Sequence, residues 1–301
     1  MAEGLAEWST ADDWDLRRVM ELKGAHRIAV VIPARNEEET VASVIGPIMT
    51  DLGGLVDEVI VMDSLSTDAT ATIAAAEGAR VHSVADVRPD LGVHPGKGEA
   101  LWKSLFVTDA DVLVFIDADL TDWGTHFVTG LVGPLLADPE VMLVRGFYDR
   151  VLDAGSAPSL EGGRVTELVA RPWLALHRPE LSSVIQPLAG EWAVRRSALQ
   201  HLWIPMGYGI EISTLLDIHD RHGLGAIAQV DLGRRAHRHQ SLHDLSAMAL
   251  ELLVTAERRR GDASDGGPGD SVPLSLPLPD RSWDVRQVPT GERPPHEIVD
   301  S

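Results

Sequence analysis

The sequence predicts an α/β protein built on a mainly parallel β-sheet with helices on both faces. Two observations lead to this fold class. Short apolar runs rich in Val and Ile recur along the chain, and helix-like segments with capping residues at their starts separate them. Strands that alternate with helices favour a parallel sheet, because each right-handed crossover returns the chain to the same end of the sheet.

The first expected strand is RIAVVI at residues 27–32, which ends at a proline and has the composition of a strand buried on both faces. A helix is expected over residues 37–49, because its valines and isoleucines share one side. The second strand is EVIVM at residues 58–62. After it, the Ser-Thr-Asp segment at 66–68 offers capping side chains for a helix that extends to Glu77.

A third strand is expected at residues 79–83, followed by a helix over 96–106 and a fourth strand over 111–116. Later in the chain, the apolar segment GIEISTLLDI favours a helix, and residues 226–232 favour another strand. In open sheets of this kind, ligands bind at the carboxyl ends of the strands. Polar residues follow three of the expected strands, so we expect the site there.

The two ends of the chain differ in composition from the middle. Residues 1–24 form an N-terminal extension that contains a short docking helix. Residues 261–301 are rich in proline and glycine, and their apolar residues show no sustained period. Such a segment does not bury enough apolar surface to offset the entropy lost on ordering, so we expect a disordered tail.

Charge and cysteine content exclude several function classes. Acidic residues outnumber basic ones 46 to 26, for a formal net charge of −20. Binding to duplex nucleic acid requires a basic footprint and is disfavoured, although a few local Arg and Lys side chains can still bind a small anion. The chain has no cysteine, no signal-peptide pattern and no long apolar run. We therefore expect a soluble cytoplasmic protein that binds neither nucleic acid nor membrane.

Two common nucleotide-binding motifs are missing. No Gly-x-Gly-x-x-Gly follows the first expected strand, which disfavours a dinucleotide-binding dehydrogenase. The segment HPGKGEA resembles a P-loop only in part, because Gly98 stands where Ser or Thr would hold magnesium.

The tripeptide Asp117-Ala118-Asp119 ends the fourth expected strand. Alternate residues of a strand share a face, so both carboxylates are expected to point the same way. Two hard oxygen ligands suit Mg²⁺ or Mn²⁺ beside a diphosphate. The alternative is an exposed pair that caps the next helix, and the tripeptide alone does not decide between the two.

Longer segments resemble a known family. The segments VVIPARNEEETVASVI, DEVIVMDSLSTDATATIAAAEGARV, GKGEALWKSL and VLVFIDADL are similar to GT-A glycosyltransferases. The segments GGRVTELVARPWL, IQPLAGEWAVRR, GYGIEISTLLD and QVDLGRRAHRHQSL resemble the actinobacterial glucosyl-3-phosphoglycerate synthases, which are retaining enzymes. The resemblance runs in order from Ile28 to Met248.

The resemblance implies a GT-A fold with a Rossmann-like sheet. Residues 25–147 would form the nucleotide-sugar-binding half, and residues 148–260 the acceptor-binding half of the same domain. The implied reaction transfers glucose from UDP-glucose to the 2-hydroxyl of 3-phosphoglycerate, with Mg²⁺ or Mn²⁺ as cofactor. Relatives also suggest a homodimer.

Site residues follow from the same resemblance, position by position. The implied catalytic residues are Lys97, Asp119, Leu188 and Glu211, with Glu211 on the transferred glucose and the Leu188 backbone near it. The implied donor-binding residues are Pro33, Ala34, Asn36, Glu37, Ser64, Lys97, Asp117 and Ala118. Asp119 and His237 would hold the metal. Gly163, Arg164 and Thr166 would bind the acceptor's phosphate or carboxylate, with His239 nearby.

Each of these roles has a structural alternative. Asn36 can read a pyrimidine edge or only shape a turn, and Lys97 can bind phosphate or only carry a solvated charge. Gly96 and Gly98, on either side of Lys97, permit close backbone approach. Burial of Glu211 demands a polar partner, which is either a sugar hydroxyl or another protein group. Arg164 can bind an anion at a helix opening or form a surface ion pair.

Four positions depart from the family pattern. Ala118 stands where close relatives have serine, Arg35 where they have an apolar residue, Leu65 where they have glycine, and His239 where they have asparagine. Because of these departures, an alternative is a related GT-A enzyme that uses another nucleotide-sugar as donor or another small anion as acceptor. A non-catalytic nucleotide-sugar-binding protein is a further alternative. A sugar nucleotidyltransferase is disfavoured, because its Gly-x-Gly-x-Arg segment is absent near the first strand.

Overall fold

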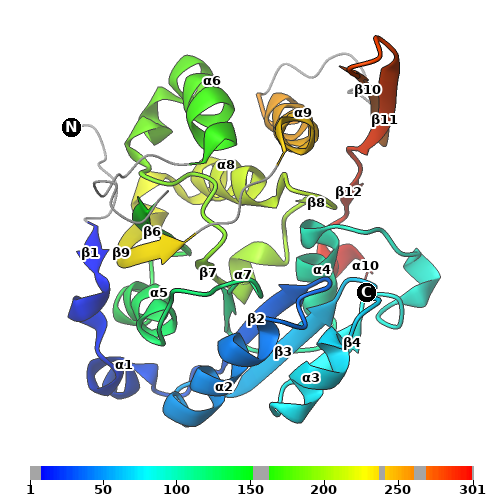
Figure 1. Cartoon of the computed structure of the whole chain (residues 1–301). Coiled ribbons are helices and arrows are strands. Elements are labelled where there is room, and N and C mark those ends of the chain that lie inside the picture. Colours follow the sequence, from blue (N-terminus) through cyan, green and yellow to red (C-terminus); the bar gives the residue numbers. More distant parts are fainter. Residues whose placement is uncertain (1–7, 152–162, 237–240, 261–268, 300–301) are drawn as a thin grey trace.

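The computed structural model of the chain describes residues 8–151, 163–236, 241–260 and 269–299 (Figure 1). Within these residues an eight-stranded sheet has the order β1-β9-β6-β7-β5-β2-β3-β4. Its strands are β1 (Ser9–Thr10), β2 (Ile28–Ala34), β3 (Glu58–Asp63), β4 (Arg80–Ser83), β5 (Val112–Phe115), β6 (Leu143–Val151), β7 (Trp192–Arg195) and β9 (Ile227–Ala236). The five strands expected from the sequence are confirmed as β2, β3, β4, β5 and β9.

Strand β7 is the one antiparallel member of this sheet. It lies between β5 and β6 and runs against both, whereas the other neighbouring pairs are parallel. The prediction of a mainly parallel sheet is therefore confirmed. Because β7 is only four residues long and fully apolar except at its end, its sequence carries no period that reveals its direction.

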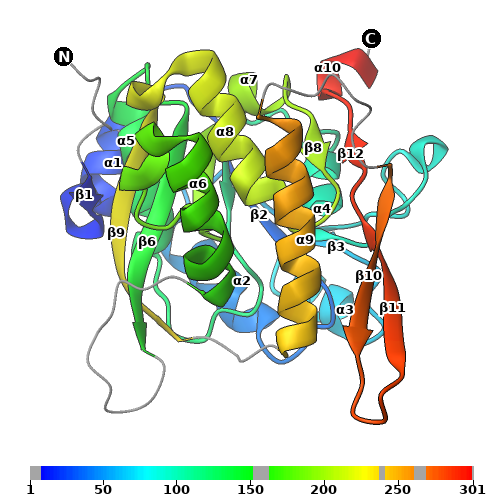
Figure 2. The same ribbon diagram turned by 90° about the horizontal axis from the view of Figure 1, so that it is seen from above.

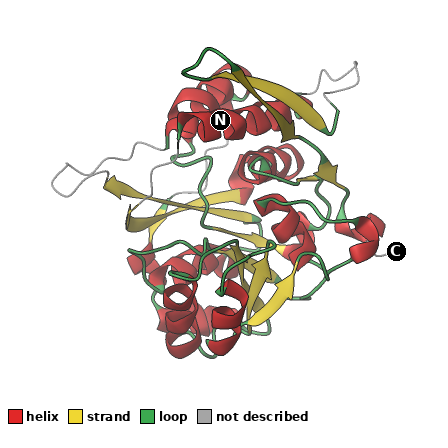
Figure 3. Cartoon of the chain, turned by 45° about the vertical axis from the view of Figure 1, so that its right-hand side comes forward, coloured by secondary structure: helices red, strands yellow, loops and turns green. Residues whose placement is uncertain are grey.

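Helices cover both faces of the sheet (Figure 3). One face packs against α1 (Leu16–Lys23), α2 (Val41–Asp51), α3 (Thr70–Ala76) and α5 (His126–Ala137). The other packs against α4 (Lys97–Ser104), α6 (Arg171–His177), α7 (Arg196–Leu199), α8 (Ile210–His222) and α9 (Leu242–Arg258). Strand β2 serves both layers, since Ala29 and Val31 join one core and Val30 and Ile32 join the other.

The N-terminal docking helix is confirmed as α1, which contacts α5. A 3₁₀ turn, η1 (Ala11–Trp14), precedes it and places the Trp14 ring against α5 at Gly133. A Cβ atom at position 133 would stand 2.2 Å from the Trp14 ring, so only glycine permits this contact. Val19 is fully buried beneath the helix.

The expectation of a disordered C-terminal tail was wrong for residues 269–299. An antiparallel hairpin of β10 (Ser271–Pro277) and β11 (Trp283–Pro289) lies beside α9 (Figure 2). It is followed by β12 (Glu292–Arg293), which pairs with β8 (Ile204–Pro205), and by α10 (His296–Val299). The prolines in β10 and β11 disfavour a strand in sequence reasoning, although exposed and less exposed residues alternate along both strands. In addition, part of the tail is held by polar contacts with the body of the protein, which composition does not reveal.

No helix in the part of the chain that the structure describes is both long and apolar enough to cross a bilayer.

Candidate active site

Lys97 lies at the centre of a polar cluster formed by four separate parts of the chain. It is the first residue of α4, and its Nζ lies 2.7 Å from Asp117 Oδ1, just beyond β5. The same atom lies 3.0 Å from Glu211 Oε1, in the first turn of α8, and donates to the Gly190 carbonyl at 3.4 Å. The start of α4 and the segment after β5 thus bring Lys97 and Asp117 together.

Lys97 is positively charged in this arrangement. Burial alone would lower the pKa of Lys97, but the carboxylates of Asp117, Glu211 and Glu191 outweigh it and raise the pKa above its ordinary value. The alternative of a solvated surface lysine is wrong, because the side chain is only 13% exposed. The ammonium is therefore a fixed cation at the carboxyl end of the sheet.

Gly96 and Gly98 permit a close approach within the protein. A Cβ atom at Gly96 would stand 2.3 Å from the Met206 carbonyl oxygen, and one at Gly98 would stand 1.8 Å from that of Pro205. The amides of Gly98 and Glu99 donate to the carbonyls of Gly207 and Met206, at 3.2 and 2.9 Å. These contacts join the start of α4 to the segment between β8 and α8.

Glu211 obtains its polar partner from the protein, since its carboxylate pairs with Lys97. Its backbone carbonyl accepts a hydrogen bond from Arg145 at 2.5 Å. Arg145, on β6, is only 1% exposed and lies over the Trp192 ring at 5.0 Å. Burial lowers the pKa of Arg145 to about 10. Sequence reasoning missed this residue, because a single arginine in a strand gives no sign that it is buried.

Two loops form the expected donor-binding edge beside β2 and β3. The amide of Ser64 donates to the Ala34 carbonyl at 2.8 Å, and the amide of Glu37 donates to Thr70 Oγ1 at 2.8 Å. Pro33 and Ala34 end β2. The loops that carry these predicted residues are therefore linked to one another.

Asn36 shapes a turn in this pair of loops. Its Oδ1 accepts from the Thr67 amide at 2.8 Å, and its φ angle is +56°. The structure thus supports the turn alternative for its amide oxygen. Leu65 also has a positive φ, +62°, in the backbone region that favours glycine.

Asp63 is one of the polar residues expected at the strand ends, although the family resemblance assigns it no role. It is 7% exposed at the end of β3, and its Oδ2 accepts from the Ser66 amide at 3.3 Å. Within the described ranges its Oδ1 has no hydrogen-bond partner. The only signal in the sequence is an acidic residue at the end of an apolar strand.

The structure gives the two strand-end aspartates different surroundings. Asp117 pairs with Lys97, whereas Asp119 lies two residues farther on, beyond the buried Ala118. Neither caps the next helix, because α5 begins at His126 with Thr125 at its N-cap. The capping alternative is therefore wrong.

Asp119 has the hard oxygen donor that Mg²⁺ or Mn²⁺ requires. Its predicted partner His237 lies outside the described residues, directly after β9, as does His239. Among the residues that the structure does describe, no group of three or more His, Asp and Glu side chains could hold a metal ion. Asp119 is the one predicted metal ligand that lies within the described residues.

The expected acceptor residues lie at the start of a separate helical segment. Gly163 precedes it, Arg164 is its exposed first residue, and Thr166 is buried where a π-helical stretch, η3 (Thr166–Ala170), begins. Arg171 continues the segment and donates to the carbonyls of Val184 and Ile185. These two bonds connect the helical segment to the loop that carries Leu188.

Comparison with known proteins finds relatives along most of the chain. The model of Glycosyl transferase family 2 matches residues 29–203. The chain is 46% identical to the glucosyl-3-phosphoglycerate synthase of Mycobacterium tuberculosis over 299 residues, which cover 95% of this chain and 90% of that protein. It is 45% identical to the synthase of Petrotoga mobilis over 251 residues, covering 81% and 77% of the two chains.

Solved structures give the same result. The structure of the Mycobacterium tuberculosis synthase with Mn²⁺, UDP and phosphoglyceric acid matches with a TM-score of 0.85 at 46% identity over 95% of each chain. The structure of that enzyme with Mn²⁺ and UDP-glucose matches with a TM-score of 0.88 at 45% identity, covering 99% of this chain and 100% of the other.

Proposed function

The chain belongs to glycosyl transferase family 2 and, within it, to the glucosyl-3-phosphoglycerate synthases, and from this we propose that it transfers glucose from UDP-glucose to the 2-hydroxyl of 3-phosphoglycerate. Related structures hold UDP-glucose, phosphoglyceric acid and the product glucosyl-3-phosphoglycerate. The observation in this chain that carries the proposal is the Lys97 ammonium, fixed between Asp117 and Glu211 at the carboxyl end of β5.

The chemical demand is the departure of a diphosphate. The bond between glucose C1 and the phosphate oxygen breaks, and UDP leaves with the electron pair. The acceptor hydroxyl oxygen bonds to C1 on the same face, and its proton passes to the departing phosphate oxygen. A preorganised cation stabilises the charge that develops on the leaving group, and Lys97 is such a cation.

Glu211 is assigned to the glucose and not to nucleophilic attack. Its carboxylate is paired with Lys97 at 3.0 Å, and Arg145 fixes its backbone carbonyl, so the side chain is held in place. A fixed carboxylate can accept a hydrogen bond from a sugar hydroxyl and so select the sugar. Leu188 stands two residues before Gly190, so its backbone would border the same position.

The metal belongs beside the donor diphosphate. Asp119 and His237 would hold Mg²⁺ or Mn²⁺, and structures of the Mycobacterium tuberculosis synthase contain either ion together with UDP. When bound, the ion neutralises negative charge on the diphosphate. Pro33, Ala34, Glu37, Ser64 and the Asp117-Ala118 backbone would surround the nucleotide. Asn36 would support this pocket through its turn.

The acceptor would bind where the helical segment begins at Arg164. A guanidinium and the backbone amides of a helix start can together receive a phosphate or carboxylate. Gly163 leaves space for close approach, and Thr166 supplies a hydroxyl in the first turn. His239 would lie nearby. We place the reaction in the cytoplasm, because both substrates are anionic and do not cross membranes unaided. We also propose that the protein assembles as a homodimer.

One experiment tests the function directly. The purified chain is incubated with Mg²⁺ or Mn²⁺ and a matrix of nucleotide-sugars and phosphorylated hydroxy acids, and products are detected by mass spectrometry. We expect the largest turnover with UDP-glucose and 3-phosphoglycerate. Faster turnover with another pair would identify a related transferase with a different donor or acceptor. Binding of UDP-glucose with no turnover on any acceptor would identify a non-catalytic binding protein.

A further inference from the structure

The C-terminal strand β12 is linked by side-chain bonds to both elements that carry the Lys97–Glu211 pair. It pairs with β8, with Glu292 opposite Pro205 and Arg293 opposite Ile204. The Met206 amide extends this pairing by donating to the Gly291 carbonyl at 3.1 Å. Figure 1 shows β12 beside β8 and α4.

Arg293 attaches this strand to α4. Its Nε and Nη2 donate to the two carboxylate oxygens of Glu99, at 2.7 and 2.8 Å, and its Nη1 donates to the Leu91 carbonyl at 2.8 Å. Glu99 is fully buried and stands two residues after Lys97 in the same helical turn. Lys103 lies 3.3 Å from the same carboxylate. The position of the helix turn that carries Lys97 therefore depends on a residue near the end of the chain.

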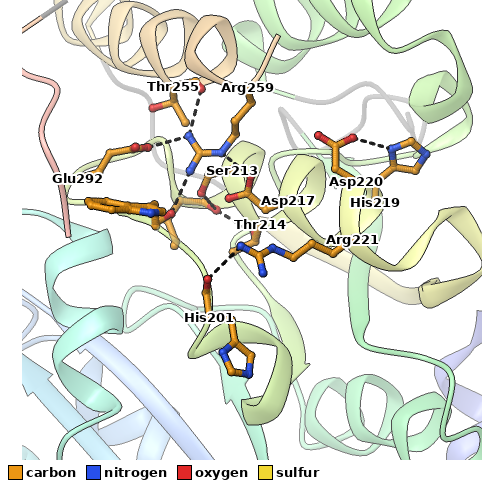
Figure 4. A network of polar contacts seen from close by, with 12 residues as sticks. His201, Ser213, Thr214, Asp217, His219, Asp220, Arg221, Thr255, Arg259 and Glu292 are labelled. Carbon is orange, nitrogen blue, oxygen red and sulfur yellow. Dashed lines mark hydrogen bonds and ion pairs between the residues drawn. The ribbon is translucent and has the colours of Figure 1, made fainter. Parts of the chain in front are cut away.

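Glu292 attaches the opposite side of the strand to α8 and α9. Its carboxylate accepts from Arg259 Nη1 at 2.7 Å, and Arg259 Nε donates to Asp217 Oδ1 at 2.8 Å (Figure 4). Arg259 also donates to the Trp203 carbonyl at 2.9 Å, immediately before β8. Asp217 lies on the same helix as Glu211.

Adjacent residues of a strand point to opposite sides, which explains how two neighbours can reach two different helices. Arg293 bonds to Glu99 on the helix of Lys97. Glu292 bonds to Arg259, which in turn bonds to Asp217 on the helix of Glu211. A link of this kind holds the distance between the two helices, and hence the 3.0 Å contact between their side chains.

We propose that β12 is a brace that positions Lys97 against Glu211, with Arg293 and Glu292 as its two positioning residues. This inference rests on the proposed function for its effect on catalysis, but the brace itself is a property of the fold. Arg293 touches neither reacting atom, and its effect passes through Glu99 and α4.

The test uses the full chain with single substitutions. Arg293→Met removes the bidentate contact, and Arg293→Lys restores the charge without the planar fork. Arg286→Met is the matched control, because Arg286 lies in the same C-terminal segment, pairs with Asp244 and Asp284, and contacts neither α4 nor α8 through those bonds. Glu292→Gln removes the charge of the other arm, leaves Arg259 paired with Asp217, and keeps the test possible if Arg293→Met folds poorly.

Two measurements are made on each folded variant: steady-state kinetics and amide hydrogen exchange. Since a small displacement of a reacting group costs catalysis heavily, Arg293→Met should lower kcat by about tenfold or more, with both KM values within about threefold. Amides of residues 97–103 and 210–214 should exchange faster. The kcat and the exchange rates of Arg293→Lys should lie between those of Arg293→Met and those of the unsubstituted chain. Arg286→Met should match the unsubstituted chain in both measurements.

Unchanged exchange at these two helix starts in folded Arg293→Met would overturn the brace. A lower melting temperature with kcat unchanged would also overturn it, since it would reduce Arg293 to a stabilising role. If the unsubstituted chain transfers no glucose, the proposed function is wrong. The exchange measurement then still decides whether β12 holds the two helices.

Discussion

Gly190 lies directly against the carboxylate of Asp117. A Cβ atom at position 190 would stand 2.3 Å from Asp117 Oδ2 and 3.3 Å from Lys97 Nζ. The position therefore accepts only glycine if the pair between Lys97 and Asp117 is to keep its geometry. The requirement is steric, because the side chains of Asp117 and Lys97 already occupy the space that a Cβ atom at position 190 would need.

Gly190→Ala should displace Asp117 and with it the Lys97 ammonium. We expect kcat for glucosyl transfer to fall by about 10- to 100-fold, as is usual when a charged group of a site moves by about 1 Å. Stability should change by less than about 1 kcal/mol, because a side chain and not the backbone has to move. Gly225→Ala is the matched control, because a Cβ atom there meets nothing within 4 Å. Unchanged kcat in Gly190→Ala would show that the pair has no part in the reaction.

The metal assignment predicts strict dependence on a divalent cation. EDTA should abolish transfer, and added Mg²⁺ or Mn²⁺ should restore it, because the diphosphate charge is otherwise left unneutralised. Asp119→Asn should remain folded by circular dichroism and lose activity at every metal concentration. His237→Ala should need more metal for half-maximal rate. Full activity in metal-free buffer would refute the assignment.

The parallel part of the sheet was predictable from sequence, because strands buried on both faces are continuous apolar runs such as those of β2 and β5. The tail was not. Its strand β12 is two residues long, and it is ordered by contacts with partners far away in the chain, such as Arg293 with Glu99. Contacts of that separation leave no local pattern in the sequence.

The same distinction applies to the site. Lys97 begins a predicted helix and Asp117 follows a predicted strand, so both residues could be anticipated at the same edge of the sheet. Arg145 and Gly190 could not, because each is defined by what surrounds it: a buried ring and carbonyl oxygens for Arg145, a carboxylate for Gly190. Roles of this kind require the three-dimensional arrangement.

The acceptor assignment predicts a selective effect on one substrate. Arg164→Ala should raise the KM for 3-phosphoglycerate by an amount equivalent to about 1.5–3 kcal/mol, the contribution of a hydrogen bond to a charged group. The affinity for UDP-glucose, measured by calorimetry, should hardly change. Arg164→Lys should recover little, because an ammonium lacks the bidentate fork. An unchanged acceptor KM in Arg164→Ala would mean that the anion binds elsewhere.

Leu65 predicts a stabilising substitution. Its φ of +62° costs a residue with a Cβ atom about 1–2 kcal/mol, and because the side chain is 40% exposed, its removal loses less packing than removal of a buried leucine would. Leu65→Gly relieves the strain but adds about 0.5–1 kcal/mol of unfolded-state entropy, so a net gain of up to about 1 kcal/mol is expected in urea unfolding. Leu278→Gly, at similar exposure without a positive φ, should lower stability. A loss in both variants would contradict the strain at Leu65.

Glu251 lies on α9 beside the turn that leads to Glu211. Its Oε2 accepts from the Tyr208 amide at 2.6 Å, and a Cβ atom at Gly207 would stand 1.8 Å from the same oxygen. Burial, together with the charge of Glu211, raises the pKa of Glu251 to about 7, although the Tyr208 hydrogen bond acts against the rise.

The raised pKa of Glu251 predicts a pH-dependent stability difference. Between the ordinary value of 4.5 and about 7, the folded chain binds more protons at this carboxyl than the unfolded chain does, so stability falls as pH rises through this window. Glu251→Gln keeps an acceptor for the Tyr208 amide but carries no charge. It should match the unsubstituted chain near pH 4.5 and be more stable by about 1–3 kcal/mol at pH 8 in urea unfolding. Glu251→Ala, which lacks the acceptor, should be less stable than Glu251→Gln at both pH values. A stability difference between Glu251→Gln and the unsubstituted chain that does not vary with pH would show that folding does not raise the pKa of this carboxyl.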